Sequence, residues 1–214
     1  LGKAAHADSG NGCRWMGWLF QTGAYIEQDL PMASNFYERG AVLGHPGCQY
    51  ELGLIYRDGN GRLQDLEQAF SLFQLSAFQS NPFGQYLLGC MYLTGQHVEQ
   101  DYEAAMGWLQ CASEQGLACA QVELGAMYAK GLGVEEDRGK SIELYKAAAE
   151  QGDLNATFNL GAIYLNAVGV PRDIELGIDY FKQSAEAGNE EARVVLQRLR
   201  DEHGLGDGAD ITLQ

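Results

Sequence analysis

The residue types that commonly do chemistry are few in this chain and lie far apart. The four histidines, His45 and His97 among them, stand in unrelated sequence contexts, and the five cysteines form no CxxC pair. The chain has no HExxH segment and no Cys and His at the spacing of zinc ligands. Gly59 and Gly61 lie in a glycine-rich loop, but no Lys with Ser or Thr follows them as in a phosphate-binding loop. The sequence therefore predicts no catalytic residue, no metal site, no cofactor and no enzymatic activity.

Five aspartates recur at a constant step and could be read as a row of catalytic carboxylates. A general acid and its base need carboxylates within several ångström of each other, and residues one repeat apart do not meet that condition. Each aspartate instead precedes an apolar segment with helical spacing, where a side-chain oxygen can accept hydrogen bonds from the amides of the first turn. We expect these residues to be helix N-caps: Asp29, Asp65, Asp101, Asp137 and Asp173.

These aspartates belong to a repeat of 36 residues that runs through most of the chain. A glycine stands twelve residues before each of them, and an aromatic residue follows three positions after the glycine. The strings LGLIY, LGCMY, LGAMY and LGAIY keep this step without an insertion, and MGWLF lies one step earlier. Self-similarity at such a period indicates an array of similar structural units. The glycines are Gly17, Gly53, Gly89, Gly125 and Gly161.

Each unit has the pattern of a pair of helices. Apolar residues fall at positions −1, +2 and +3 from the glycine, and a second apolar stripe begins after the aspartate. Two short helices cannot bury an apolar face alone, so neighbouring pairs must stack. We therefore predict an all-α protein, a right-handed α-solenoid of helix hairpins. The predicted segments are the tail of a preceding repeat helix at 1–8, five repeats at 9–44, 45–80, 81–116, 117–152 and 153–188, a capping helix at 189–202 and a flexible tail at 203–214.

The charge and hydropathy of the chain argue against two classes of interaction. There are 29 acidic and 14 basic residues, a net charge of −15, whereas nucleic-acid phosphates are bound by Lys and Arg. Residues 63–129 contain seven acidic residues and no basic one, so a partner of this part should be neutral or basic. No apolar run approaches the roughly 20 residues of a membrane span, and no signal-peptide pattern follows Leu1. We expect neither nucleic-acid binding nor a membrane span, and the compartment stays open.

With the LGxxY pattern, the glycine-containing loop, the aspartate and the AAEQG ending, the chain resembles the Sel-1-like repeat family, which is related to the tetratricopeptide repeats. The resemblance covers about residues 9–202. It implies an adaptor that holds a partner protein or peptide in a concave groove. The alternative that the family and the acidic middle suggest is an immunity protein that neutralises a secreted bacterial toxin by direct binding. Both roles fit a bacterial protein that is periplasmic, secreted or cytoplasmic.

The cysteines leave one covalent question open. Their number is five, so at least one thiol of the monomer is free. A cysteine-rich branch of the resembled family bridges each helix pair through cysteines eight residues apart, and Cys111 and Cys119 have that separation. They lie two residues out of that register relative to the glycine, however, and two residues turn a helix by roughly 200°. Whether these two cysteines are bridged stays undecided by the sequence.

The resemblance also indicates where a partner would bind, because in related solenoids the first helices line the concave side. At about 100° per residue, positions −3, +1 and +4 from the glycine lie opposite the core stripe. The first three repeats carry large side chains there, of types that are frequent at binding hot spots. The predicted groove residues are Arg14, Trp18, Gln21, Tyr50, Leu54, Arg57, Tyr86 and Leu93. For Tyr50, Tyr86 and Phe158 the alternative is packing between successive first helices.

A second candidate surface lies at the end of the second repeat. Leu75 and Phe78 occupy positions that hold Gln183 and Glu186 in the fifth repeat, and Phe83 follows just after the turn. Large apolar residues where polar ones usually stand predict an exposed apolar patch, which often marks a contact site. A contact between two copies of the chain, a homodimer, would have the same pattern.

Overall fold

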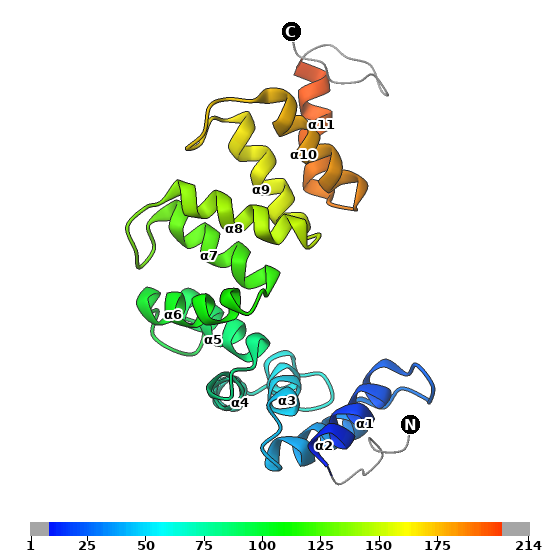
Figure 1. The fold of residues 1–214 in the computed structure, drawn as a ribbon. Helices are drawn as coiled ribbons and strands as arrows, with labels where there is room; N and C mark the ends of the chain where they lie inside the picture. Colours follow the sequence, from blue (N-terminus) through cyan, green and yellow to red (C-terminus); the bar gives the residue numbers. More distant parts are fainter. Residues whose placement is uncertain (1–8, 203–214) are drawn as a thin grey trace. The chain divides into compact units, whose positions relative to one another are not determined.

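The computed structural model of the chain describes residues 9–202, which fold into helices joined by short loops. Figure 1 shows the helices as successive antiparallel pairs. The predicted helix tail at 1–8 and the flexible tail at 203–214 lie outside the described residues. In chain order the helices are α1 (Gly10–Thr22), α2 (Leu30–Val42), α3 (Pro46–Asp58), α4 (Leu66–Phe78), α5 (Pro82–Thr94), α6 (Tyr102–Glu114), α7 (Ala118–Lys130), α8 (Arg138–Glu150), α9 (Leu154–Leu165), α10 (Ile174–Glu186) and α11 (Glu190–Glu202).

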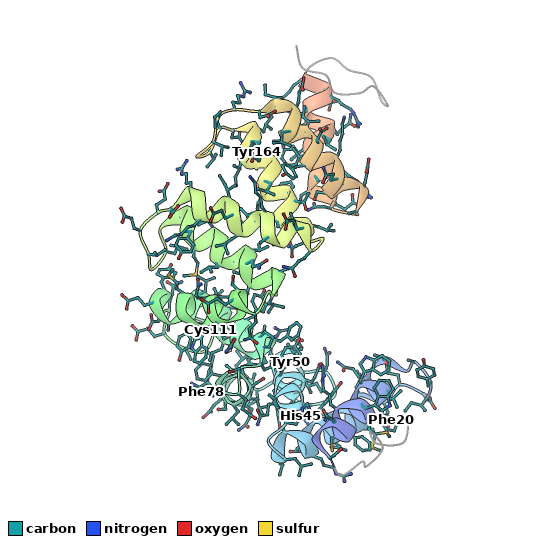
Figure 2. All side chains as sticks on the ribbon, viewed as in Figure 1. Phe20, His45, Tyr50, Phe78, Cys111 and Tyr164 are labelled. Atoms are coloured by element: carbon teal, nitrogen blue, oxygen red, sulfur yellow. The ribbon has the colours of Figure 1, made fainter. Side chains whose placement is uncertain are left out.

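The helices group into two compact units, one with α1–α6 and one with α7–α11. In the first unit α1 packs on α2, α3 on α4 and α5 on α6, while α2 against α3 and α4 against α5 join the hairpins. In the second unit α7 packs on α8 and α9 on α10, with α8 against α9 and α10 against α11. The chain is therefore an all-α solenoid of helix hairpins, as the repeat predicts. Figure 2 adds the side chains that fill each hairpin.

The repeated aspartates are N-caps, as the sequence predicts. Each of the five precedes a second helix and accepts a hydrogen bond from a backbone amide of that helix's first turn. Asp65, for example, accepts from the amides of Glu67 and Gln68, both at 3.0 Å. An N-cap of this kind typically stabilises a helix by about 1 kcal/mol. The start of every second helix is therefore fixed by the same residue.

The repeated glycines lie where the two helices of a hairpin cross. A Cβ atom added at Gly53 would lie 2.5 Å from the ring of Phe73, closer than real Cβ contacts come. The residue twenty positions after each glycine supplies this contact in every hairpin. The other four distances are 2.6 Å for Gly17 and Tyr37, 2.8 Å for Gly89 and Leu109, 3.0 Å for Gly125 and Tyr145 and 3.0 Å for Gly161 and Phe181. The predicted approach of two backbones is confirmed at Gly89, Gly125 and Gly161, where a backbone carbonyl of the second helix lies 3.1 to 3.3 Å from the added Cβ, while at Gly17 and Gly53 the glycine makes room for an aromatic ring.

A ladder of buried glutamines also supports the hairpins, and the sequence analysis did not single it out. The residue after the second helix donates from its Nε2 atom to the Oε1 atom of a buried glutamine on the first helix of the same hairpin. The donor and acceptor pairs are Gln79 with Gln49 at 2.7 Å, Gln115 with Gln85 at 2.8 Å and Gln151 with Gln121 at 2.9 Å. Because a buried amide without a partner costs free energy, each pair ties the end of the second helix to the first.

All five cysteines lie within the described residues, and all are free thiols. Cys111 is exposed and Cys119 is half-buried, so the bridge that the sequence left open is not formed in this structure. Cys13 and Cys48 are fully buried, and burial raises the pKa of the Cys48 thiol to about 12. Among residues 9–202, no helix is long and apolar enough to cross a membrane.

Candidate functional site

The predicted groove residues divide into a packed group and an exposed group. The ring of Tyr50 on α3 lies 5.3 Å from that of Phe83 on α5, and Tyr50 and Leu54 pack against the core cluster that contains Phe73. The Tyr50 ring thus bridges successive first helices, which is the packing alternative. Phe158 instead contacts Phe181 of its own hairpin, with ring centroids 5.2 Å apart. These aromatic rings contribute to the scaffold.

Two further predicted groove residues are held by polar contacts. The Arg57 guanidinium donates to both carboxylate oxygens of Asp58, at 2.7 and 3.0 Å. The amide oxygen of Gln21 accepts a hydrogen bond of 2.6 Å from the Tyr37 hydroxyl. Tyr86 and Leu93 on α5 are half-buried. In the predicted row, the exposed side chains are therefore Arg14 and Trp18, both on α1.

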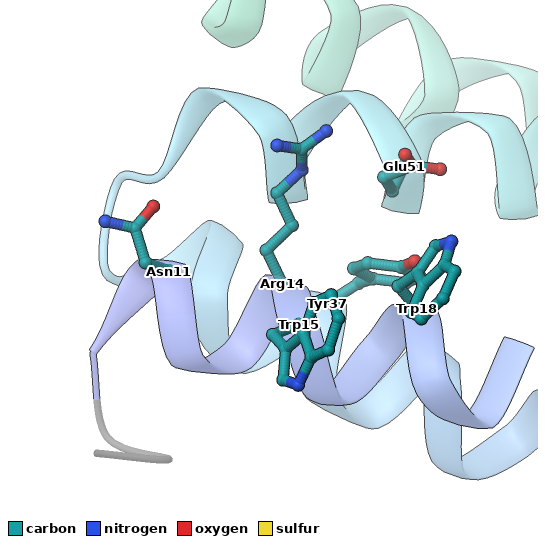
Figure 3. Close-up of a pocket in the computed structure, with 6 residues that line it drawn as sticks. All are labelled: Asn11, Arg14, Trp15, Trp18, Tyr37 and Glu51. Atoms are coloured by element: carbon teal, nitrogen blue, oxygen red, sulfur yellow. The ribbon is translucent and has the colours of Figure 1, made fainter. Parts of the chain in front are cut away.

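Arg14 and Trp18 line a pocket of about 250 Å³ between the two first helices α1 and α3. We call it the tryptophan pocket. Its six residues come from three helices: α1 supplies four, α2 supplies a tyrosine at the base, and α3 supplies a glutamate from the opposite wall (Figure 3). They are Asn11, Arg14, Trp15, Trp18, Tyr37 and Glu51. The first-helix face thus carries a concave site, with two of its residues predicted from the sequence.

The walls of the pocket include two stacked indoles. The ring centroids of Trp15 and Trp18 are 5.0 Å apart and their planes differ by 21°. Trp15 is 52% exposed and Trp18 37% exposed, which is high for the largest apolar side chain. Tyr37, by contrast, is only 1% exposed and fills the crossing at Gly17. The indoles are therefore displayed on a rigid base.

Two opposite charges face this pocket without pairing. Among residues 9–202, neither Arg14 nor Glu51 forms a hydrogen bond or an ion pair, and Figure 3 shows them on different helices. Burial raises the pKa of the half-buried Glu51 carboxyl, while the charge of Arg14 acts in the opposite direction. The pocket thus combines a carboxylate that is short of partners, an exposed guanidinium and two indole faces.

The three residues of the predicted apolar patch fall in two neighbourhoods. Phe78 is 72% exposed and contacts Trp108 of α6 edge-on, with ring centroids 5.4 Å apart. Leu75, on the same helix, is 53% exposed. Phe83 lies against Tyr50 of α3 instead, at 5.3 Å. Leu75 and Phe78 form an exposed apolar edge of α4. Phe83 does not join them, because its ring packs against Tyr50 on the first helix α3.

Sequence reasoning missed four of the six pocket residues: Asn11, Trp15, Tyr37 and Glu51. Trp15 and Glu51 stand at position −2 from their glycines, outside the predicted face of positions −3, +1 and +4. The signal that could have found Trp15 is its spacing from Trp18, because residues three apart are neighbours on a helix surface. In the part of the chain that the structure describes, no group of three or more His, Cys, Asp or Glu residues could hold a metal ion.

Comparison with known proteins bears on the whole array. The family model described as Sel1 repeat matches five consecutive segments, residues 10–45, 46–80, 82–117, 120–153 and 154–189. No curated protein matches the chain. The five matched segments contain all six residues of the tryptophan pocket.

Three solved structures illustrate the likeness. A Sel1 repeat protein from Oxalobacter formigenes superposes with a TM-score of 0.87 at 28% identity, over 98% of this chain and 85% of that one. A protective antigen present in uropathogenic Escherichia coli strains, which displays an SLR fold, gives 0.82 at 30% identity over 94% of this chain and 44% of its own. An immunity protein from Pseudomonas aeruginosa gives 0.62 at 21% identity, over 93% and 73%. The last likeness shows the fold alone.

Proposed function

Because the chain belongs to the Sel1 repeat family, whose members are scaffolds for protein–protein interaction, we propose that it binds a segment of another protein at the tryptophan pocket. The single observation that carries this proposal is the display of two exposed indoles on a buried base. Trp and Arg are enriched among the residues that contribute most of the binding energy at interfaces. Such residues typically lie in pockets from which the bound partner excludes water. The N-terminal first-helix face is therefore the expected centre of the binding site.

The neighbouring first helices extend this site without repeating it. Tyr50 and Phe83 form a packed aromatic floor between α3 and α5, and Arg57 is held beside it by Asp58. A partner segment that lies across α1 and α3 could continue over this floor toward Tyr86 and Leu93 on α5. The rigid backbone lowers the entropy cost of binding, because few groups have to be ordered.

The alternative role as a toxin-neutralising immunity protein is less well supported. The Pseudomonas aeruginosa immunity protein resembles this chain at 21% identity, a level at which only the fold is shared. A dimer through the exposed edge of Leu75 and Phe78 likewise has no observation in its favour beyond exposure. We therefore propose the adaptor role.

The experiment starts from affinity capture and is decided with purified proteins. The full chain is used as bait beside two variants, Trp18→Ala and the matched control Tyr25→Ala, which removes an 80% exposed aromatic ring outside the pocket. A captured protein is then purified, and its affinity for each chain is measured by calorimetry. We expect Trp18→Ala to weaken binding at least about tenfold, because hot-spot truncations cost 2 kcal/mol or more, and Tyr25→Ala to leave it unchanged. Equal affinity for the wild type and Trp18→Ala would contradict the proposal.

A further inference from the structure

We propose that the tryptophan pocket accepts a basic side chain, arginine or lysine, from the partner segment, held between the indoles of Trp15 and Trp18 and the carboxylate of Glu51. This inference rests on the proposed function, since it names the chemistry of what binds there. It concerns one pocket and one type of side chain. Two features of the pocket support it, the aromatic wall and the unpaired carboxylate, together with the net negative charge of the whole chain.

The aromatic wall favours a cation. The indole face carries the negative end of the ring quadrupole, and Trp is the best of the aromatic partners for a guanidinium or ammonium group. Trp15 and Trp18 stack at 5.0 Å yet remain 52% and 37% exposed, so ring surface is still available to a ligand. In Figure 3 the indole of Trp18 and the side chain of Glu51, which both line the pocket, lie at the same end of the view, away from Asn11. A planar guanidinium could therefore stack on an indole and reach the carboxylate together.

Glu51 supplies the charge that a bound cation would neutralise. It is half-buried in the pocket wall, with no hydrogen bond or ion pair among residues 9–202. A carboxylate in this position loses part of its hydration free energy without gaining a hydrogen-bond partner. A charge-assisted hydrogen bond from a ligand would compensate for that loss. Burial raises its pKa for the same reason. The pocket is thus incomplete on its acidic side.

Arg14 is the positive group that lines the pocket, and it decides between a basic and an acidic ligand. Its guanidinium is exposed and can stay in water while a second cation enters. An acidic ligand would pair with Arg14 but would face the indole quadrupoles and Glu51, which both repel it. His45, near the pocket rim through its contact with Asn11, has a pKa lowered by burial and therefore adds little positive charge at neutral pH.

The wider chain also favours a basic partner. The net charge of the whole chain is −15, and residues 63–129 carry acidic but no basic side chains, whereas residues 1–62, which contain the pocket, hold six acidic and five basic residues. A field of this sign speeds the approach of a basic segment and slows that of an acidic one. The two indoles and Glu51 would then fix one side chain of the arriving segment.

The chain contains three tryptophans, which makes a direct test possible. Trp15 and Trp18 line the pocket, whereas Trp108 on α6 contacts Phe78 elsewhere in the same unit. With ¹⁵N-labelled tryptophan, the three indole N–H signals are followed by NMR during titration with capped tripeptides: Gly-Arg-Gly, its neutral citrulline analogue and Gly-Glu-Gly. We expect the arginine peptide to shift the Trp15 and Trp18 signals and not that of Trp108. Its affinity should exceed that of the citrulline peptide at least about fivefold.

Charge variants sharpen the test. Glu51→Gln keeps the side-chain shape and should weaken binding of the arginine peptide about tenfold, while Arg14→Gln should leave it unchanged or strengthen it. The matched control is Glu123→Gln. Glu123 stands at the same position of α7 and is also half-buried, but no tryptophan is near it in sequence. The circular dichroism spectrum of each variant checks that it is folded.

The opposite pattern would overturn the inference. If Gly-Glu-Gly binds more tightly than Gly-Arg-Gly and Arg14→Gln abolishes that binding, the pocket takes an acidic group. If no peptide moves the Trp15 or Trp18 signal beyond that of Trp108, the pocket takes no charged side chain. Neither result decides the proposed function, because that is judged by the affinity of the captured partner for Trp18→Ala.

Discussion

The tryptophan pocket and a second pocket, lined by residues of α7, α8 and α9, share a repeated tyrosine and differ in the rest of their lining. Each is lined by a tyrosine that stands twenty residues after a crossing glycine, Tyr37 in one and Tyr145 in the other. At position +1 from the glycine, the hairpin that supplies Tyr37 has Trp18, and the hairpin that supplies Tyr145 has Ala126, which does not line the second pocket. The second pocket measures about 190 Å³. Recognition can therefore change while the scaffold does not.

The two pockets also differ in their charged residues. Position −2 is Glu51 in the first pocket and Asn159 in the second. Arg138 of the second pocket is paired with Glu136 at 2.6 Å, whereas Arg14 and Glu51 of the first are unpaired among the described residues. A charged group in a pocket that has no hydrogen bond or ion pair can form one with a ligand. In this comparison the residues that recur in every repeat stabilise the fold, and the residues that differ between repeats give each pocket its own binding properties.

The largest effect that would sharpen the comparison concerns the tightness of the crossings. An alanine Cβ at Gly53 would lie 2.5 Å from the Phe73 ring, but at Gly161 it would lie 3.0 Å from the Phe181 ring. We expect Gly53→Ala to cost about 2 kcal/mol through overpacking. At Gly161 the better helix propensity of alanine, worth about 1 kcal/mol, should offset most of the strain.

The midpoint of chemical denaturation, followed by circular dichroism, measures both changes. Gly107→Ala is the matched control, because this helical glycine has nothing within 4 Å of its added Cβ. It should stabilise the chain by up to about 1 kcal/mol. Equal losses at Gly53 and Gly161 would contradict the idea that the crossings of the first unit are tighter.

The next effect tests what the two units share. Gln85→Leu and Gln121→Leu each remove the side-chain acceptor of a glutamine that follows the second helix, Gln115 in one unit and Gln151 in the other. Each donor is exposed and keeps a backbone acceptor, the carbonyl of Cys111 or Ala147, so the loss of the side-chain hydrogen bond should cost about 1 kcal/mol. Because the two pairs have nearly equal lengths, 2.8 and 2.9 Å, we expect similar shifts of the denaturation midpoint, with the larger at Gln85, which also donates to the carbonyl of Ala77 at 3.4 Å. A shift in one unit alone would break the analogy between them.

The residues that repeat are those that the sequence predicts best. Asp65 and its equivalents were expected to be N-caps, and Gly53 and its equivalents to be crossing residues, because each has a function that one residue type fulfils locally. The paired glutamines recur with the same period of 36 residues. Their partners lie on two different helices, however, so the periodicity of a single helix does not reveal that they form a hydrogen bond. Fold class and helix order therefore follow from periodicity.

The candidate site was predicted only in part, for a physical reason. Arg14 and Trp18 follow from helix angles within α1, whereas Glu51 enters the pocket because α3 lies beside α1. That relation depends on how two hairpins pack, which a single helix does not encode. The same applies to Phe83, predicted to join Leu75 and Phe78, whose ring lies against Tyr50 because the start of α5 faces α3.

A smaller effect concerns the exposed edge of α4. Position +25 is Phe78 in the second repeat and a glutamate in the third, fourth and fifth: Glu114, Glu150 and Glu186. Phe78→Glu should therefore be tolerated, with a cost of about 1 kcal/mol for the lost edge contact with Trp108. The fluorescence of the chain should also change, since Trp108 loses its ring neighbour. A loss well above 2 kcal/mol would mean that Phe78 is not the exposed side chain that its 72% exposure indicates.

The smallest effect comes from two loop positions where the repeat departs from glycine. Ala167 has a φ of 57° where the other repeats have glycine, and His97 has a φ of 71° where Gly61, Gly133 and Gly169 stand. A left-handed conformation costs a side-chain-bearing residue roughly 1 to 2 kcal/mol, but glycine loses about 0.4 to 1 kcal/mol more through the freedom of the unfolded chain. We therefore expect Ala167→Gly to stabilise the chain by about 0.5 kcal/mol.

His97→Gly should behave differently, although its backbone conformation is similar. The His97 ring lies 6.0 Å from Phe70, so glycine would relieve the backbone and remove a ring contact together. The two terms are similar in size, and the denaturation midpoint of His97→Gly should stay near that of the wild type. If His97→Gly stabilises as much as Ala167→Gly, the histidine ring contributes nothing to its loop. If His97→Gly clearly destabilises the chain, the contact between the His97 and Phe70 rings outweighs the backbone strain. The histidine would then stabilise the first unit more than the glycine found in other repeats.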